Sequence, residues 1–263
     1  MATVKKVYAY LNQKAPFYSQ SSFDNAGFLV GRSDKQVKRI LVALDITEAV
    51  AHEAAQLQAD LIISHHPVIW DGAKSVTDET LLGRKLLALL QNDIAAICAH
   101  TNLDAAKGGV NDCLAAALGL RDTELLKVYG TYEDGTPYGI EQIGTVEGDM
   151  PLTAFAAQVK KTLGSNGVRY VDAGKPVRKV AVGGGSCSSS IKDAAAAGCD
   201  TFVTADVKYD SFLDAKALGL NLIDAGHYPT ENLVCSVLVD WLKEGFSDTE
   251  VILSDHKEVF HYL

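Results

Sequence analysis

The chain has 263 residues, of which 48% are hydrophobic and 22% charged. This composition excludes a disordered or fibrous chain and is sufficient for one large α/β domain or two lobes of roughly 130 residues each. The formal net charge of −9 opposes approach to a nucleic-acid backbone or an anionic membrane, so neither is expected as a partner. Bound divalent cations would make the local charge positive, so a phosphorylated small substrate stays compatible with the net negative charge.

Five cysteines lie in apolar or small-residue segments without a C-x-x-C pair, so we expect buried, reduced thiols. No segment approaches the roughly 18 uncharged apolar residues of a membrane span, and the first residues contain no apolar core of signal-peptide length. A soluble, cytoplasmic protein is therefore expected.

Strand-like apolar runs alternate with helix-like stretches, which is typical of a mostly parallel sheet with helices on both faces. In the first half, strands are predicted over 40–44, 61–64 and 94–99, and helices over 48–58, 78–90 and 110–118, with Thr47 and Thr77 before the first two helices. In the second half, helices are predicted over 152–163, 191–197 and 231–243, and strands over 180–183, 201–204 and 220–223. Residues 128–147 are predicted as antiparallel strands or a crossover.

A weak internal repeat relates residues 38–66 to 178–206 at a constant offset of 140, pairing Arg39 with Lys179, Asp60 with Asp200 and His66 with Asp206. We therefore predict an α/β protein of two related lobes, duplicated βαβ-type units with mostly parallel sheets, and a metal site in the cleft between them. The predicted first lobe is 1–125, with 225–263 packing against it, and the second is 126–224.

His65 and His66 follow the apolar run 61–64 and precede Pro67, so two imidazoles are expected where a buried strand ends. Adjacent residues on a regular strand point to opposite faces, so both rings can reach one site only if the chain has left the strand, which Pro67 favours. We predict that at least one of the pair binds a metal ion, and we interpret His52, His256 and His261 as structural or surface residues.

His100 and Asp104 follow the next strand, ahead of Gly108 and Gly109. Asp104 lies too far from the helix at 110 to act only as its cap. His100 is a candidate ligand, a partner of a ligand or a proton shuttle, and its structural and ligand roles stay open.

His227 and Glu231 follow the strand at 220–223. With Pro229 and Thr230 as helix-start signals, Glu231 is expected in the first helical turn, where it would either compensate the helix dipole or bridge two cations. The turn Gly183-Gly184-Gly185-Ser186 lacks the spacing of known phosphate loops, and a structural turn and a ligand loop stay open as alternatives.

Imidazole and carboxylate donors without a thiolate suit zinc, manganese or iron, and six such groups exceed the needs of one four-coordinate ion. The sequence therefore predicts two divalent ions per chain.

Five motifs together resemble the Nif-three-like dinuclear metal-centre proteins, some of which are labelled GTP cyclohydrolase type-two-like. They are FDNAGFLVG (23–31), ISHHP (63–67), HTNLD with GGVND (100–112), TADVKYD (204–210) and AGHYPTE (225–231). The resemblance implies a two-lobed α/β subunit, a toroidal homohexamer and two metal ions per subunit. By motif, the implied ligands are His65, His66, Asp104, His227 and a bridging Glu231, with His100 close by.

Two departures from the family pattern are visible. Asp210 stands where members usually have a histidine, and the chain has no room for the inserted domain of the longer members.

The leading hypothesis is a dinuclear metal-dependent hydrolase that attacks a small, phosphorylated or nucleotide-like molecule through a metal-bound water, with His100 as the catalytic proton shuttle. The alternative is a non-catalytic metal-binding scaffold or regulatory hexamer, which needs the same ligands and no substrate. A nucleotide-binding module that uses the glycine turn ranks third.

Overall fold

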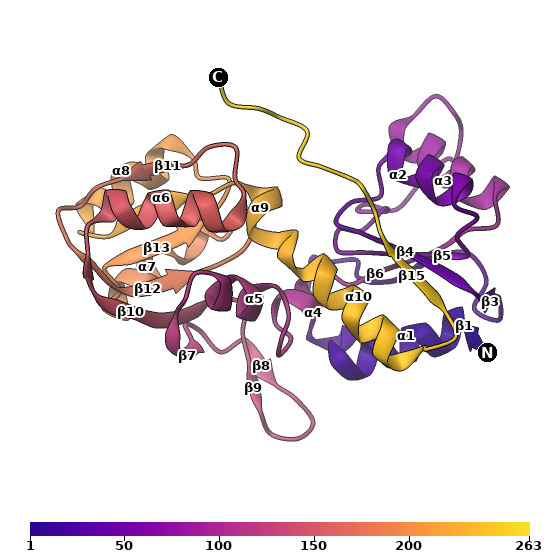
Figure 1. The fold of residues 1–263 in the computed structure, drawn as a ribbon, viewed down its shortest axis with the longest axis horizontal. Helices are drawn as coiled ribbons and strands as arrows, with labels where there is room; N and C mark the ends of the chain where they lie inside the picture. Colours follow the sequence, from indigo (N-terminus) through magenta and orange to yellow (C-terminus); the bar gives the residue numbers. More distant parts are fainter. The chain divides into compact units, whose positions relative to one another are not determined.

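A computed structural model describes residues 1–263, which form two compact units. The first comprises Met1–Lys107 and Val234–Lys257, and the second comprises Gly108–Leu233 and Glu258–Leu263. Each unit is an α/β structure with its own sheet, as the alternating pattern predicts (Figure 1).

The first unit is built on a five-stranded sheet in the order β15-β4-β5-β6-β2. Its strands are β2 (Gly27–Val30), β4 (Arg39–Ala43), β5 (Leu61–Ser64), β6 (Ala95–Cys98) and β15 (Glu250–Leu253), and a small ribbon pairs β1 (Ala2–Thr3) with β3 (Gln36–Val37). Four of the five strands run parallel, and β2 is the antiparallel edge. All residues of β5 and β6 are buried, as expected of parallel strands covered on both faces.

Helices cover both faces of this sheet. They are α1 (Val4–Lys14), α2 (Glu48–Gln56), α3 (Leu81–Gln91), the single turn α4 (Thr101–Asp104) and α10 (Leu233–Gly245). Leu41 and Ile62 pack in one cluster with residues of α2 and α3. The alternate residues Ile40 and Ile63 are also fully buried and face the side where α1 and α10 lie next to each other (Figure 1).

The second unit contains a six-stranded sheet in the order β11-β14-β13-β12-β10-β7. Its strands are β7 (Arg121–Leu125), β10 (Gln142–Met150), β11 (Arg169–Val171), β12 (Val177–Val182), β13 (Thr201–Thr204) and β14 (Asn221–Asp224). Strands β12, β13 and β14 are parallel, and β10 is antiparallel to both of its neighbours. With the short hairpin β8 (Gly130–Thr131) and β9 (Pro137–Tyr138), this confirms antiparallel strands over 128–147.

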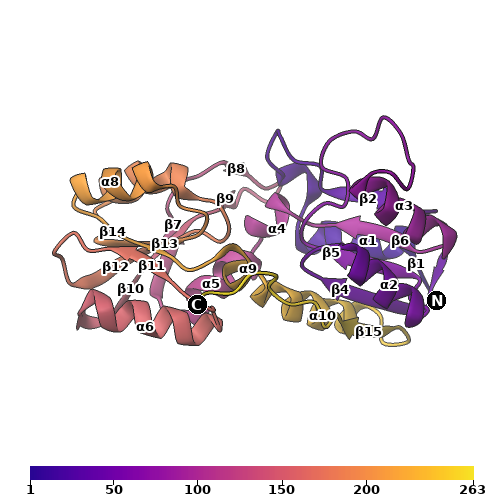
Figure 2. The same cartoon turned by 90° about the horizontal axis from the view of Figure 1, so that it is seen from above.

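The helices of the second unit are α5 (Val110–Ala117), α6 (Leu152–Leu163), α7 (Ile191–Ala196), α8 (Tyr209–Ala217) and the short α9 (His227–Glu231). One core cluster joins α5 and α6 to the sheet around Phe155, and a second joins α7 and α8 to the opposite face around Phe202. Figure 2 shows α6 and α8 on opposite sides of their sheet.

The predicted duplication extends to individual hydrogen bonds. Asp60 Oδ2 accepts from the backbone N–H groups of Lys38 and Arg39 at 2.7 and 3.1 Å. At the same offset of 140, Asp200 Oδ2 accepts from Arg178 and Lys179 at 3.0 and 2.7 Å. The side chains of Arg39 and Lys179 likewise each donate to the carbonyl of the residue 18 positions further on, Leu57 and Ala197. The two units therefore share a βαβ framework with the same polar contacts.

The predicted domain boundaries at 125/126 and 224/225 are wrong. Leu114 and Leu118 pack with Phe155 in the second core, so the chain enters the second unit at Gly108. Residues 225–233 also belong to the second unit, because Ala225 and Leu233 join the same cluster. Only Val234–Lys257 returns to the first unit, and Glu258–Leu263 belong to the second.

Two predicted helix starts also need correction. The helix expected from residue 78 begins at Leu81, because the Thr80 hydroxyl accepts from Gly83 N at 2.9 Å and serves as the cap in place of Thr77. Thr77 instead lies against Gly83 so closely that a Cβ on Gly83 would stand 1.8 Å from its carbonyl oxygen. The helix expected from Glu231 is interrupted, since Glu231 ends α9 and α10 begins at Leu233.

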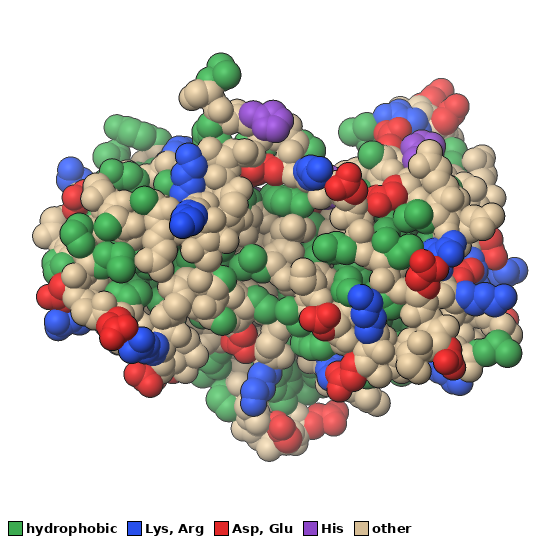
Figure 3. Space-filling view, in the orientation of Figure 1, with side chains coloured by type: hydrophobic (Ala, Val, Ile, Leu, Met, Phe, Trp, Pro, Cys, Tyr) green, Lys and Arg blue, Asp and Glu red, His purple; other side chains and the backbone are tan.

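Acidic and basic side chains are interspersed over the face shown in Figure 3. None of the helices combines the length and apolar character needed to cross a membrane.

Candidate functional site

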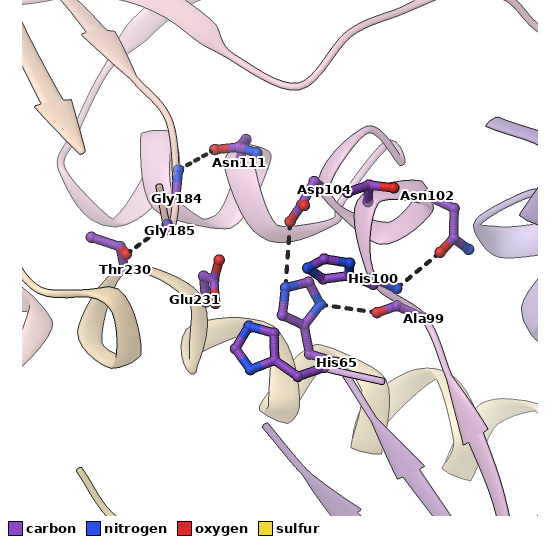
Figure 4. A network of polar contacts seen from close by, with 12 residues as sticks. His65, Ala99, His100, Asn102, Asp104, Asn111, Gly184, Gly185, Thr230 and Glu231 are labelled. Atoms are coloured by element: carbon purple, nitrogen blue, oxygen red, sulfur yellow. Dashed lines mark hydrogen bonds and ion pairs between the residues drawn. The ribbon is translucent and has the colours of Figure 1, made fainter. Parts of the chain in front are cut away.

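His65 lies at the end of β5 and is fully buried. Its Nδ1 is 2.9 Å from the carbonyl oxygen of Ala99, and its Nε2 is 3.6 Å from Asp104 Oδ1. A carbonyl oxygen only accepts, so Nδ1 carries a proton, and in the neutral imidazole Nε2 is the ring nitrogen with a lone pair. Figure 4 shows the imidazole between the carbonyl and the carboxylate, with Nε2 turned toward Asp104.

His66 follows where the chain has left the strand. Ser64 Oγ donates to the His66 carbonyl at 2.8 Å, and His66 Nδ1 is 2.8 Å from Asp45 Oδ1, beyond the end of β4. The rings of His65 and His66 are consequently only 4.9 Å apart between centroids, which confirms that the two neighbours do not project to opposite faces.

His100 directly precedes α4, after the end of β6. Its backbone N–H donates to Asn102 Oδ1 at 3.0 Å, and the fully buried Asn102 in turn donates to the carbonyl of Ala15 at 2.8 Å. Its Nδ1 is 2.8 Å from Asp24 Oδ1. One potential ligand atom from each of His65, His66 and His100 lies within 4.8 Å of the others.

Asp24 is the acceptor that orients His100, and its side chain is fully buried. Burial alone would raise the pKa of this carboxyl, but hydrogen bonds from His100 and Thr101 outweigh it and hold the pKa at about 2. Both the N–H and the hydroxyl of Thr101 donate to Oδ2. Asp24 is therefore ionised at neutral pH and accepts the Nδ1–H of His100, which directs Nε2 of this ring to metal binding or proton transfer.

Asp104 is 8% exposed and ends α4. The single turn reverses the chain after β6, and this brings the carboxylate back to His65. The first unit thus gathers four of the predicted site residues, namely His65, His66, His100 and Asp104.

The second unit holds the other two. Gly226 has a φ of +91°, a conformation that side chains disfavour, and it starts α9 directly after β14. His227 and Glu231 are one turn apart on α9, with His227 Nε2 3.0 Å from Glu231 Oε2. Nδ1 of His227 is 2.6 Å from Asp206 Oδ2, just beyond the end of β13. Glu231 is 3% exposed and is the last residue of α9, so it does not lie in a first helical turn as expected.

The glycine turn after β12 is a structural element that supports Glu231. The amides of Gly183, Gly184 and Gly185 donate to Val203 O, Asn111 Oδ1 and Thr230 Oγ1, at 3.0, 2.8 and 3.0 Å. These three N–H groups are therefore engaged within the protein, unlike those of a phosphate loop. A Cβ on Gly185 would stand 2.1 Å from Glu231 Oε1, so the close approach of the carboxylate requires glycine.

All four site histidines share one arrangement. Nδ1 of each ring meets an oxygen acceptor, which is Ala99 O for His65, Asp45 for His66, Asp24 for His100 and Asp206 for His227. Histidines that bind metals through Nε2 almost always hold Nδ1–H in this way, because the acceptor fixes the tautomer and the ring orientation. The donor sets of both units therefore fit divalent metal ions by their chemistry.

Asp24 and Asp45 were not predicted as site residues, and Asp206 was singled out only as the equivalent of His66 in the internal repeat. Asp45 and Asp206 follow apolar strands in the same manner as the histidines, and this was the signal available for them. Asp24 lies in FDNAG, outside any predicted element. Asp210, where the family pattern has histidine, is exposed on α8.

Comparison with known proteins identifies the family of this chain. The family described as Duf34/NIF3 (NGG1p interacting factor 3) matches residues 2–258. A Clostridium perfringens protein named GTP cyclohydrolase 1 type 2 homolog is 36% identical over 256 residues, covering 95% of each chain. A Helicobacter pylori protein named GTP cyclohydrolase 1 type 2 is 34% identical and covers 88% of each.

Solved structures give the same result. The Bacillus cereus protein related to NIF3 superposes with a TM-score of 0.94 at 26% identity, covering 100% of this chain and 99% of that one. Reduced HcgD from Methanocaldococcus jannaschii superposes with a TM-score of 0.82 at 30% identity, covering 97% and 98%. The fold, the motifs and the sequence relatives agree, and the chain belongs to the Duf34/NIF3 family.

Proposed function

We propose that this protein is a metal-dependent hydrolase of a small, nucleotide-like molecule and that it holds two divalent ions, zinc, iron or manganese, per chain. The observation that carries the proposal is the shared arrangement of His65, His66, His100 and His227, each with Nδ1 held by an oxygen acceptor. The names of the relatives, GTP cyclohydrolase 1 type 2 and its homolog, support a nucleotide-related substrate.

In this proposal the metal ligands are His65, His66 and Asp104 in the first unit and His227 and Glu231 in the second. Divalent ions held there would supply Lewis acidity and lower the pKa of water. The buried Asp104 and Glu231 carboxylates would offset the ionic charge, and the oriented imidazoles would supply neutral donors.

His100 is our candidate for proton transfer. Its Nδ1–H is held by the ionised Asp24, so Nε2 can accept a proton and the resulting imidazolium is stabilised by the carboxylate behind it. His100→Gln is expected to lower turnover by about 10²- to 10⁴-fold while the metal content stays at the wild-type level. A parallel loss of metal would instead make His100 a ligand.

Elemental analysis of purified protein tests metal binding directly. We expect about two ions per wild-type chain and a sharp fall in His66→Ala and in Glu231→Ala. His52→Ala is the matched control, because His52 is exposed on α2. Loss of all metal from either variant would show that both donor sets serve the same ions, and loss of part would show separate sites.

Hydrolysis of a nucleotide panel by holo and chelator-treated protein tests the reaction. Turnover that requires metal supports the hydrolase. A protein that retains its metals and hydrolyses nothing on the panel would be a binding scaffold.

We also propose a homohexamer in the cytoplasm. The resemblance to toroidal family members supports the assembly, and the five free cysteines support a reducing compartment. Light scattering should then give six times the 28.1 kDa chain mass.

A further inference from the structure

Two exposed aromatic side chains lie near each other within the first unit, and one of them contacts the ring of His100. Phe23 is 68% exposed and Trp70 is 51% exposed, and their ring centroids are 6.4 Å apart with the planes inclined by 37°. The Trp70 ring also meets the His100 ring edge-on, at 5.4 Å between centroids. Large aromatic surface is therefore presented to water beside a histidine of the proposed site.

Polar contacts of neighbouring residues link the segments that carry the two rings. Asn25 Nδ2 donates to the carbonyl of Ile69 at 2.7 Å, which ties the segment of Phe23 to the segment of Trp70. Asp24, next to Phe23, is the buried carboxylate that holds His100. The positions of the two rings and of the catalytic candidate are thus set by one connected group of contacts.

We propose that Phe23 and Trp70 form the stacking surface for a planar heteroaromatic ring of the substrate, with the reacting edge of that ring toward His100. The inference rests on the proposed hydrolase function and specifies the class of substrate. A planar π-system is the occupant that fits, because aromatic side chains bind flat rings by offset or edge-to-face contact.

The size of the patch favours a small molecule over a protein. Two aromatic side chains can bury about 150–250 Å² each. A specific protein interface needs about 800 Å² on each partner. The pair is large enough for one ring system and far too small to hold a second chain by itself.

Calorimetric titration of the purified, metal-containing protein with guanosine and adenosine tests the proposal, with ribose as the non-aromatic control. Stacking predicts that both nucleosides bind and ribose does not. Trp70→Ala and Phe23→Ala should each weaken nucleoside binding by about 5- to 100-fold, and Trp70→Phe should retain most of it. Leu90→Ala is the matched control, since Leu90 is an exposed apolar residue near the end of α3.

Fluorescence adds a reading at the site itself. The chain has two tryptophans, so Trp241→Phe leaves Trp70 as the only reporter, and nucleosides should quench it in a saturable manner.

Absence of quenching and of binding heat in protein that carries its metals would overturn the stacking surface alone. Nucleoside binding that Trp70→Ala weakens, in metal-containing protein that hydrolyses nothing on the nucleotide panel, would support the stacking surface while the hydrolase proposal fails. A change in the number of chains per assembly in Phe23→Ala and Trp70→Ala, with unchanged nucleoside affinity, would show that the two rings form a contact between copies and would overturn the proposal.

Discussion

At the scale of single residues, the aspartates behind the histidines determine how the imidazoles are presented. The Asp24 carboxylate accepts from the imidazole N–H of His100, from the N–H and hydroxyl of Thr101 and from the backbone N–H of Asn25. A substitution that keeps the size of this side chain and changes only its charge and one acceptor is therefore informative.

Asp24→Asn should lower turnover by about 10- to 100-fold while the metal content stays at the wild-type level, because the amide puts a donor opposite another donor and removes the charge that orients His100. Hydrolysis of the nucleotide panel and elemental analysis measure the two quantities. Asp34→Asn, at an exposed position, is the control and should match the wild type. Equal turnover in all three proteins would refute an orienting role.

Tyr129 gives a pH prediction away from the histidines. Burial, together with the nearby Glu141 carboxylate, raises its pKa to about 12, and its hydroxyl is 3.2 Å from Glu141 Oε2. Because the folded state favours the neutral phenol, this contribution to stability is complete below the ordinary pKa of 10.0 and is lost as the pH rises toward about 12.

Glu141→Gln should move the pKa of Tyr129 back toward its ordinary value, since the negative charge is gone. Phenolate absorbance followed over alkaline pH measures it, with Tyr129→Phe identifying the signal. An unchanged titration in Glu141→Gln would mean that the carboxylate does not act on Tyr129.

The sequence allowed the histidines to be predicted but not their partners. An imidazole after an apolar run is visible locally, as at His65 and His100. The partnership of His100 with Asp24 spans 76 positions and that of His66 with Asp45 spans 21, so each depends on tertiary structure that local patterns do not contain.

At the scale of elements, the strength of the local sequence signal differs between α1 and α8, two of the helices that were not predicted. In α1 the buried residues Val4, Val7 and Leu11 recur at helical spacing, so the pattern was present among its polar residues. In α8 only Ala215 is buried, and no apolar stripe marks it. The break between α9 and α10, at Asn232, likewise has no local sequence signal.

The start of α3 offers a test of capping. Thr80→Ala should lower the free energy of unfolding by about 1 kcal/mol, because the Gly83 N–H loses its acceptor. Urea denaturation measures the change. Thr80→Ser should retain the stability, since it keeps the hydroxyl, and Thr77→Ala should have the smaller effect. A larger loss of stability in Thr77→Ala than in Thr80→Ala would mean that Thr77 is the cap, as the sequence predicts.

At the scale of the whole molecule, periodicity predicts that a helix exists but not which sheet receives it. The helix at Val110 follows the first βαβ unit directly, and yet its apolar face, with Leu114, packs in the second core. The offset of 140 between the halves was a stronger guide, because Asp60 and Asp200 repeat the same backbone contacts in both units. Duplication could therefore be predicted where the boundary between the units could not.

Metal removal should destabilise the molecule as a whole, because ions that bind only the folded chain stabilise it by mass action. At free metal about 100 times the dissociation constant, the gain is about 2.7 kcal/mol. Chelator-treated wild-type protein should thus unfold at a lower temperature than holo protein, and calorimetry should show the midpoint rising with added metal. His52→Ala should keep this dependence in full, whereas His66→Ala should lose most of it. If the unfolding temperature of the wild type changed with neither chelator nor added metal, the imidazoles and carboxylates at the strand ends would hold no ion in the folded chain.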